Sequence, residues 1–284
     1  FATKVSVLPI FLPLALVVGM AVRRALRSDE KVGLWGRLGG LFARGILGAT
    51  VAVLVYVFWN PYAVLALDEF LSWTLREIQI VRNPGIVPYT LQYVGTSAVT
   101  YELRQTIVWA LGVPLGVLAY LGLVVSLVRN VRQPRPKELL LLVWAIPFFL
   151  LVVSFEVKFL RYIFPLLSVL VILAAALLVT MWDFTRRHYP RFAPLIVGIS
   201  VFVVLSTGFY AFAFERIYVR DHPAVQASGW INTNVSPGVH ILTDNHWDEG
   251  FPDLYKYKVD QLPMYESDSE QKVGDLVSRL AEAD

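Results

Sequence analysis

Long apolar stretches separated by short polar segments dominate the pattern of this chain. Six of the stretches are long enough to span a membrane, because a helix needs roughly 17–25 residues to cross the hydrocarbon. They cover about residues 5–22, 41–59, 106–128, 139–155, 162–182 and 192–214. The fourth contains Pro147, which buried membrane helices tolerate because neighbouring groups satisfy the freed carbonyl. The pattern therefore predicts an α-helical polytopic membrane protein with about six transmembrane helices.

The basic residues are concentrated in three of the intervening polar segments. Residues 23–44, 129–137 and 183–191 hold six, four and three of the chain's 25 lysines and arginines. If six helices alternate, these segments share one side of the membrane, which the positive-inside rule assigns to the cytoplasm. We therefore expect a multi-pass protein whose loops 60–105 and 154–161, and whose segment 215–284, are extracytoplasmic.

The loop 60–105 is too long to be a simple connector. Its first part, residues 63–81, mixes apolar and charged residues in the manner of an amphipathic helix on a membrane surface. A turn at residues 83–85 is followed by an irregular aromatic segment containing Tyr89, Gln92 and Tyr93. We expect these three side chains to line a cavity. Farther on, the Gly112–Gly116 pair is typical of close helix packing.

The segment after residue 214 has a different pattern, so we expect two domains, 1–214 and 215–284. A helix over 223–235, a strand over 239–243 and a helix from Asp268 to about residue 283 predict a small C-terminal α/β domain. The chain ends where a second strand is expected, and it begins without Met. We therefore expect a fragment, truncated at both ends.

Composition narrows the possible functions. Hydrophobic residues make up 56% of the chain, the mean hydropathy is +0.58, and there is no cysteine. Disulfides, thiolate catalysis and cysteine-bound metal are therefore excluded. The net charge of +3 gives no reason to expect nucleic-acid binding, and no phosphate-binding glycine loop or nucleophile elbow occurs. The segment Asp244–Glu249 has the residue types that hold a divalent cation, or it caps a turn; no second ligand cluster accompanies it, so we assign no metal site.

The most informative polar segment is the short loop that carries Glu156, Lys158 and Arg161 between two apolar stretches. Charges are costly at bilayer depth, so they lie at the interface or face a polar cavity. If this edge is helical, Lys158 and Arg161 lie one turn apart and point the same way. They then form a clamp for an anionic lipid-linked substrate, or they snorkel to the interface. Glu156 is a candidate general base, or it forms an ion pair that holds the loop.

Three stretches in this order carry a family resemblance. They are Phe58–Tyr62 with Gln92–Thr96, then Lys158–Pro165, and last His222–Asn232 followed by Pro237–Gly238 and Trp247–Asp248. Together they resemble the GT-C fold membrane glycosyltransferases, and in particular the bacterial relatives of the dolichyl-phosphate-mannose protein mannosyltransferases. The resemblance implies a bacterial inner-membrane enzyme that transfers a sugar from a polyprenyl-phosphate donor to an acceptor on the outer face, with inversion.

The resemblance also implies roles for individual residues. Lys158 and Arg161 would bind the lipid phosphate, and Tyr89, Gln92, Tyr93 and Tyr162 would line the sugar and acceptor pocket. The family's catalytic acid lies in the first outer loop, which this chain does not contain, so the catalytic residue is unassigned. The partners implied are a polyprenyl-phosphate-linked sugar and membrane lipids.

Two other classes of protein compete with this interpretation. A non-enzymatic transmembrane scaffold subunit of a larger membrane complex has the same helices and would need membrane-complex partners. A transporter predicts charged residues in the middle of its helices. The six apolar stretches are nearly free of such charges, so the transporter ranks last.

Overall fold

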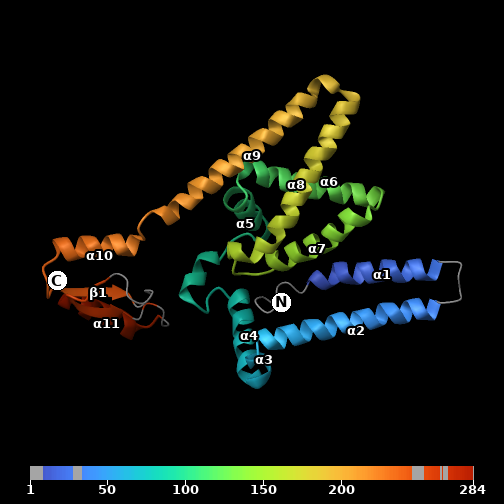
Figure 1. The fold of residues 1–284 in the computed structure, drawn as a ribbon. Helices are drawn as coiled ribbons and strands as arrows, with labels where there is room; N and C mark the ends of the chain where they lie inside the picture. The colour runs from blue at the N-terminus through green and yellow to red at the C-terminus, as the bar shows by residue number, and fades with distance from the viewer. Residues whose placement is uncertain (1–8, 28–33, 245–252, 263, 265–267, 284) are drawn as a thin grey trace. The chain divides into compact units, whose positions relative to one another are not determined.

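The computed structural model describes residues 9–27, 34–244, 253–262, 264 and 268–283. These residues form helices and one small sheet (Figure 1). The chain divides into two compact units, Phe1–Gly208 and Phe209–Asp284. The division falls inside helix α9 (Ala193–Glu215).

Five helical stretches in the described residues are long and apolar enough to cross a membrane, judged by length and composition. They are Leu38–Trp59 within α2 (Leu34–Trp59), α6 (Val113–Arg132), α7 (Pro136–Val153), α8 (Leu160–His188) and Pro190–Asn234, which contains α9. Helix α1 (Phe11–Arg27) has 17 residues and is not among them. The predicted stretch 5–22 begins outside the described residues. The described helices are those of a multi-pass helical membrane protein.

The third predicted stretch is interrupted. Residues Gln105–Ala110 form a π-helical segment, η3, and α6 begins only at Val113. Between them Gly112 has a φ of +76°, a conformation that glycine adopts without steric cost. Pro114 lies in the first turn of α6, where its missing N–H removes no helical hydrogen bond. The membrane-length helix therefore begins at Val113, about two turns after the expected start at residue 106.

Helices α6, α7 and α8 surround the main apolar core. Phe148 from α7 and Leu166 and Leu170 from α8 are fully buried in it. Gly122 brings α6 against α8, because a Cβ at this position would lie 2.5 Å from the carbonyl oxygen of Leu173. The close packing predicted for the Gly112–Gly116 pair is present at Gly116, whose added Cβ would lie 2.6 Å from the Cα of Ile107.

The loop 60–105 is largely helical. The amphipathic helix expected over 63–81 is two helices, α3 (Tyr62–Leu65) and α4 (Leu67–Arg82), which meet at Ala66 in a non-helical conformation. The turn after Asn83 is present. The segment expected to be irregular is a short 3₁₀ helix, η2 (Pro88–Tyr93), and α5 (Ala98–Arg104) follows it.

The C-terminal unit contains α10 (Pro223–Asn234), β1 (His240–Asp244), β2 (Lys258–Leu262) and α11 (Glu270–Glu282). Short 3₁₀ turns at Pro190–Phe192 and Arg216–Val219 flank α9. The two strands are parallel, with His240 opposite Lys258. The sequence interpretation missed β2 because only Val259 and Leu262 in it are apolar. It also placed the cap of α11 at Asp268, whereas Ser269 is the N-cap and accepts from the Lys272 N–H at 3.1 Å.

Candidate functional site

The loop between α7 and α8 lies against the loop 60–105. The backbone N–H groups of Glu156 and Val157 both donate to the carbonyl oxygen of Val81, at 3.1 and 3.0 Å. Val81 belongs to the last turn of α4, where carbonyl oxygens have no partner inside the helix. These two hydrogen bonds fix the loop to the end of α4. The two loops that the sequence placed on one side of the membrane therefore meet at one end of the α7–α8 pair.

An aromatic cluster surrounds Phe159, which immediately precedes α8. The centroid of the Phe159 ring lies 5.3 Å from that of Tyr93, 5.6 Å from that of Tyr162 and 6.3 Å from that of Tyr89. Tyr93 also packs edge-to-face on Tyr101 at 6.1 Å. Edge-to-face contacts at these distances stabilise aromatic clusters beyond the area they bury. The cluster thus brings together Tyr89, Tyr93 and Tyr162, three of the four residues predicted to line a pocket.

The fourth, Gln92, does not join them. Its side chain is exposed, and its Nε2 donates to the carbonyl oxygen of Tyr89 at 2.9 Å. Tyr93 is buried, and burial raises the pKa of its hydroxyl above the ordinary value. That hydroxyl therefore stays protonated at neutral pH.

Arg161 lies on the exposed side of the aromatic cluster. Its Cζ is 4.4 Å from the centroid of the Phe159 ring and 5.6 Å from that of Tyr162. A guanidinium group at these distances is attracted by the electron-rich ring faces. Stacking also restricts the side chain before any ligand binds. Arg161 is thus an exposed, partly ordered cation at the start of an apolar helix.

Lys158 does not point the same way as Arg161, because the edge is not helical at that position. Helix α8 begins at Leu160, and Phe159 before it is extended, with φ −71° and ψ 131°. Lys158 is 2% exposed. Its Nζ donates to the carbonyl oxygens of Phe155 at 2.7 Å and Glu156 at 3.3 Å. The expected two-cation clamp is therefore a single exposed arginine with a buried lysine that holds the loop together.

The buried acid of the site is Glu102 on α5, not Glu156. Glu156 is exposed, whereas the Glu102 side chain is 0% exposed. Neither Glu102 oxygen has a hydrogen-bond partner among the described residues. Burial raises the pKa of Glu102 from 4.5 to about 7, and the positive charge of Lys158 opposes that rise.

Sequence reasoning did not single out Glu102. The fully buried Thr106 lies four residues farther along the chain. Two polar residues at that spacing, at the edge of an apolar stretch, are the signal that could have distinguished Glu102.

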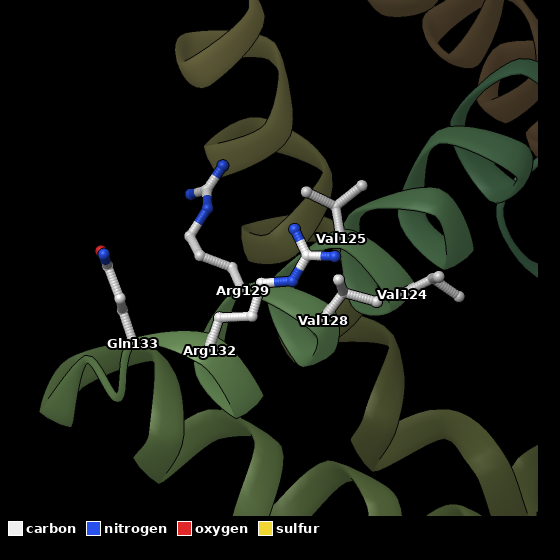
Figure 2. Close-up of a pocket in the computed structure, with 6 residues that line it drawn as sticks. All are labelled: Val124, Val125, Val128, Arg129, Arg132 and Gln133. Carbon is white, nitrogen blue, oxygen red and sulfur yellow. The ribbon is translucent and has the colours of Figure 1, made fainter.

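No metal ligand cluster supports a cofactor in the residues described: no three His, Asp or Glu side chains there are grouped for a metal ion. Most of the segment Asp244–Glu249, considered for a divalent cation, lies outside the described residues. One open hollow among the described residues lies elsewhere, near the C-terminal end of α6 (Figure 2).

No protein-family model, curated protein or solved structure matches this chain.

Proposed function

We propose that this protein is a membrane glycosyltransferase that uses a polyprenyl-phosphate sugar. The observation that carries the proposal is Arg161, an exposed guanidinium stacked on Phe159 and Tyr162 at the first turn of an apolar helix. Such a group is suited to bind a phosphodiester at the depth where lipid headgroups lie, because its planar fork pairs with two phosphate oxygens. The nearby Tyr89 is exposed and offers an aromatic face and a hydroxyl of the kind that sugar rings contact, and the buried Tyr93 packs with it on Phe159.

In the proposed reaction the bond between the anomeric carbon and the phosphate oxygen breaks. A bond from that carbon to an acceptor oxygen forms on the opposite face, and the acceptor proton passes to a base. The lipid phosphate leaves with both electrons of the broken bond, so negative charge develops on it. Arg161 stabilises this charge, the kind of interaction whose loss typically lowers rates by about 10²–10³.

The buried pair has a supporting role in this scheme. Lys158 donates hydrogen bonds to two carbonyl oxygens of the loop that precedes Arg161, and its positive charge acts on the buried Glu102 carboxyl. Because Glu102 is fully buried, it does not reach an acceptor on the surface. The base for the acceptor proton is therefore not assigned to any residue of this chain.

The test compares Arg161→Ala and Arg161→Lys with a matched control in the full-length membrane protein. Arg76→Ala is that control, because Arg76 is also exposed and stacks on an aromatic ring, that of Trp73 at 5.4 Å. Transfer is measured from a panel of radiolabelled polyprenyl-phosphate hexoses and pentoses, and binding is measured with polyprenyl phosphate alone. We expect Arg161→Ala to lose about 10²–10³ in transfer, Arg161→Lys to lose less, and Arg76→Ala to match the wild type.

Two results would reject the proposal. Undiminished transfer by Arg161→Ala would remove that residue from the mechanism. Absence of both transfer and polyprenyl-phosphate binding in the wild type, together with purification as a stoichiometric complex, would favour the scaffold subunit instead.

A further inference from the structure

A stripe on one face of α6 changes from apolar to basic toward the C-terminal end of the helix. Val125, Val128, Arg129 and Arg132 follow one another at helical spacing, so their side chains lie on the same face. Together with Val124 and Gln133 they line a hollow of about 410 Å³ (Figure 2). The three valines are 54%, 36% and 48% exposed in chain order. The hollow therefore has an apolar wall and a basic rim.

The rim is built on a fixed turn between α6 and α7. Asn130 is buried and donates to Glu138 Oε2 at 3.1 Å, while its Oδ1 accepts from the Arg135 N–H at 2.8 Å. Glu138 Oε1 lies 3.6 Å from a guanidinium nitrogen of Arg129 and 3.3 Å from one of Arg135. Arg129 also donates to Thr180 Oγ1 of α8 at 3.4 Å. Arg129 is thus held in place by groups from two neighbouring helices.

Arg132 carries the positive charge that this network does not balance. No hydrogen bond or ion pair involves the Arg132 side chain in the part of the chain that the structure describes. Its side chain extends back along α6 toward Val128 and Val125, whereas Gln133 points away (Figure 2). Residues 129–137 contain four basic residues and no acid, and Glu138 is shared between Arg129 and Arg135. The hollow therefore presents a net positive charge directly above an apolar surface.

We propose that this hollow binds one acidic phospholipid. The phosphodiester lies between Arg129 and Arg132, and an acyl chain covers Val124, Val125 and Val128. A soluble anion would pair with the arginines but leave the valines uncovered, and a neutral lipid would cover the valines without balancing the charge. Basic pockets between helix ends are the general chemistry by which membrane proteins hold acidic headgroups. This site is independent of Arg161 and of the proposed transferase reaction.

The test measures lipid binding to the purified full chain by native mass spectrometry. The probes are phosphatidylglycerol and phosphatidylcholine with the same acyl chains, and sn-glycerol 1-phosphate as a headgroup without chains. Arg132→Ala is compared with Lys137→Ala, which removes the same charge from the same turn at an exposed position outside the hollow. We expect phosphatidylglycerol to bind more tightly than phosphatidylcholine. Arg132→Ala should weaken its binding about fivefold, and Lys137→Ala should change it less than about twofold.

Each alternative outcome overturns the proposal. An equal loss in Arg132→Ala and Lys137→Ala would indicate general attraction of the basic turn for anionic lipid. Equal binding of the two phospholipids would indicate apolar contact alone. Binding of sn-glycerol 1-phosphate as tight as that of phosphatidylglycerol would show a soluble-anion site that does not use the valines.

Discussion

Glu102 on α5 lies within the electrostatic influence of Lys158 on the loop before α8, and both side chains are buried. Burial raises the pKa of the Glu102 carboxyl to about 7, while the lysine charge opposes that rise. The Lys158 ammonium group in turn donates hydrogen bonds to backbone carbonyl oxygens of its own loop. The pair therefore links the loop 60–105 to the α7–α8 connection through charge as well as through the hydrogen bonds to Val81.

The Glu102 carboxyl makes stability depend on pH. Its folded-state pKa is raised from 4.5 to about 7, so between these values the folded chain holds the proton more tightly than the unfolded chain. The free energy of unfolding therefore falls as the pH rises through this window. Glu102 lowers it by at most about 3 kcal/mol, and the loss persists at higher pH. As the pH rises from 5 to 8, we expect the melting temperature of Glu102→Gln to fall less than that of the wild type. Unfolding is followed by tryptophan fluorescence in detergent. The exposed Glu77→Gln is the control and should behave like the wild type; a wild-type pH dependence unchanged in Glu102→Gln would contradict the assignment.

Removing the Lys158 ammonium group should destabilise the loop strongly. Lys158→Met keeps most of the side-chain volume but leaves the carbonyl oxygens of Phe155 and Glu156 without their donor. Leaving buried acceptors without a donor typically costs about 1–3 kcal/mol. The measurement is the melting temperature of Lys158→Met, Glu102→Gln and the double variant. We expect the double variant to be more stable than the sum of the single effects predicts; strict additivity would show that the two residues are not coupled.

The contact between α6 and α8 at Gly122 should not tolerate a methyl group. A Cβ there would lie 2.5 Å from the Leu173 carbonyl oxygen, which is backbone and does not rotate away. Gly122→Ala must therefore separate the two helices, and overpacking of this kind costs about 1–3 kcal/mol. Gly198→Ala on α9 is the matched control, because nothing lies within 4 Å of its added Cβ. Thermal unfolding should show a lower melting temperature for Gly122→Ala and an unchanged or slightly higher one for Gly198→Ala.

In the C-terminal unit, His240 should be a major link between β1, β2 and α11. Its Nε2 lies 2.9 Å from Asp260 Oδ2 on β2, and its Nδ1 lies 3.0 Å from the carbonyl oxygen of Glu282 on α11. His240→Ala leaves these partly buried groups unpaired, at a cost of about 1–3 kcal/mol. Limited proteolysis of the full chain should cut this unit faster in His240→Ala than in the wild type. The exposed Gln271→Ala should be cut at the wild-type rate, and equal rates for all three proteins would show that His240 does not hold the unit together.

The sequence predicted the apolar helices well because their signal is local. Long apolar stretches favour helices wherever lipid surrounds them. Helices α7 and α9 therefore lie within three residues of the expected bounds, and α2 and α8 contain the expected stretches. The interruption before Val113 escaped prediction because apolar content does not distinguish a continuous helix from a π-helical segment followed by a glycine at positive φ. Strand β2 was not predicted for a related reason. A short strand with few apolar residues is stabilised by pairing with its neighbouring strand, and its own sequence pattern does not reveal it.

The candidate site divides in the same way. The sequence by itself determined that a basic, aromatic loop follows an apolar helix, and it named Lys158, Arg161 and the tyrosines around them. Only the tertiary structure decided that Lys158 turns inward while Arg161 stays exposed. It also decided that the buried acid is Glu102 and not Glu156, which is close to Lys158 in the sequence. Burial and charge pairing depend on which distant backbone segments meet, here α4, α5 and the loop before α8. The pattern of side chains along the sequence does not show which distant segments will pack together. The free energy of burying a polar group arises only when the packed segments exclude water from it.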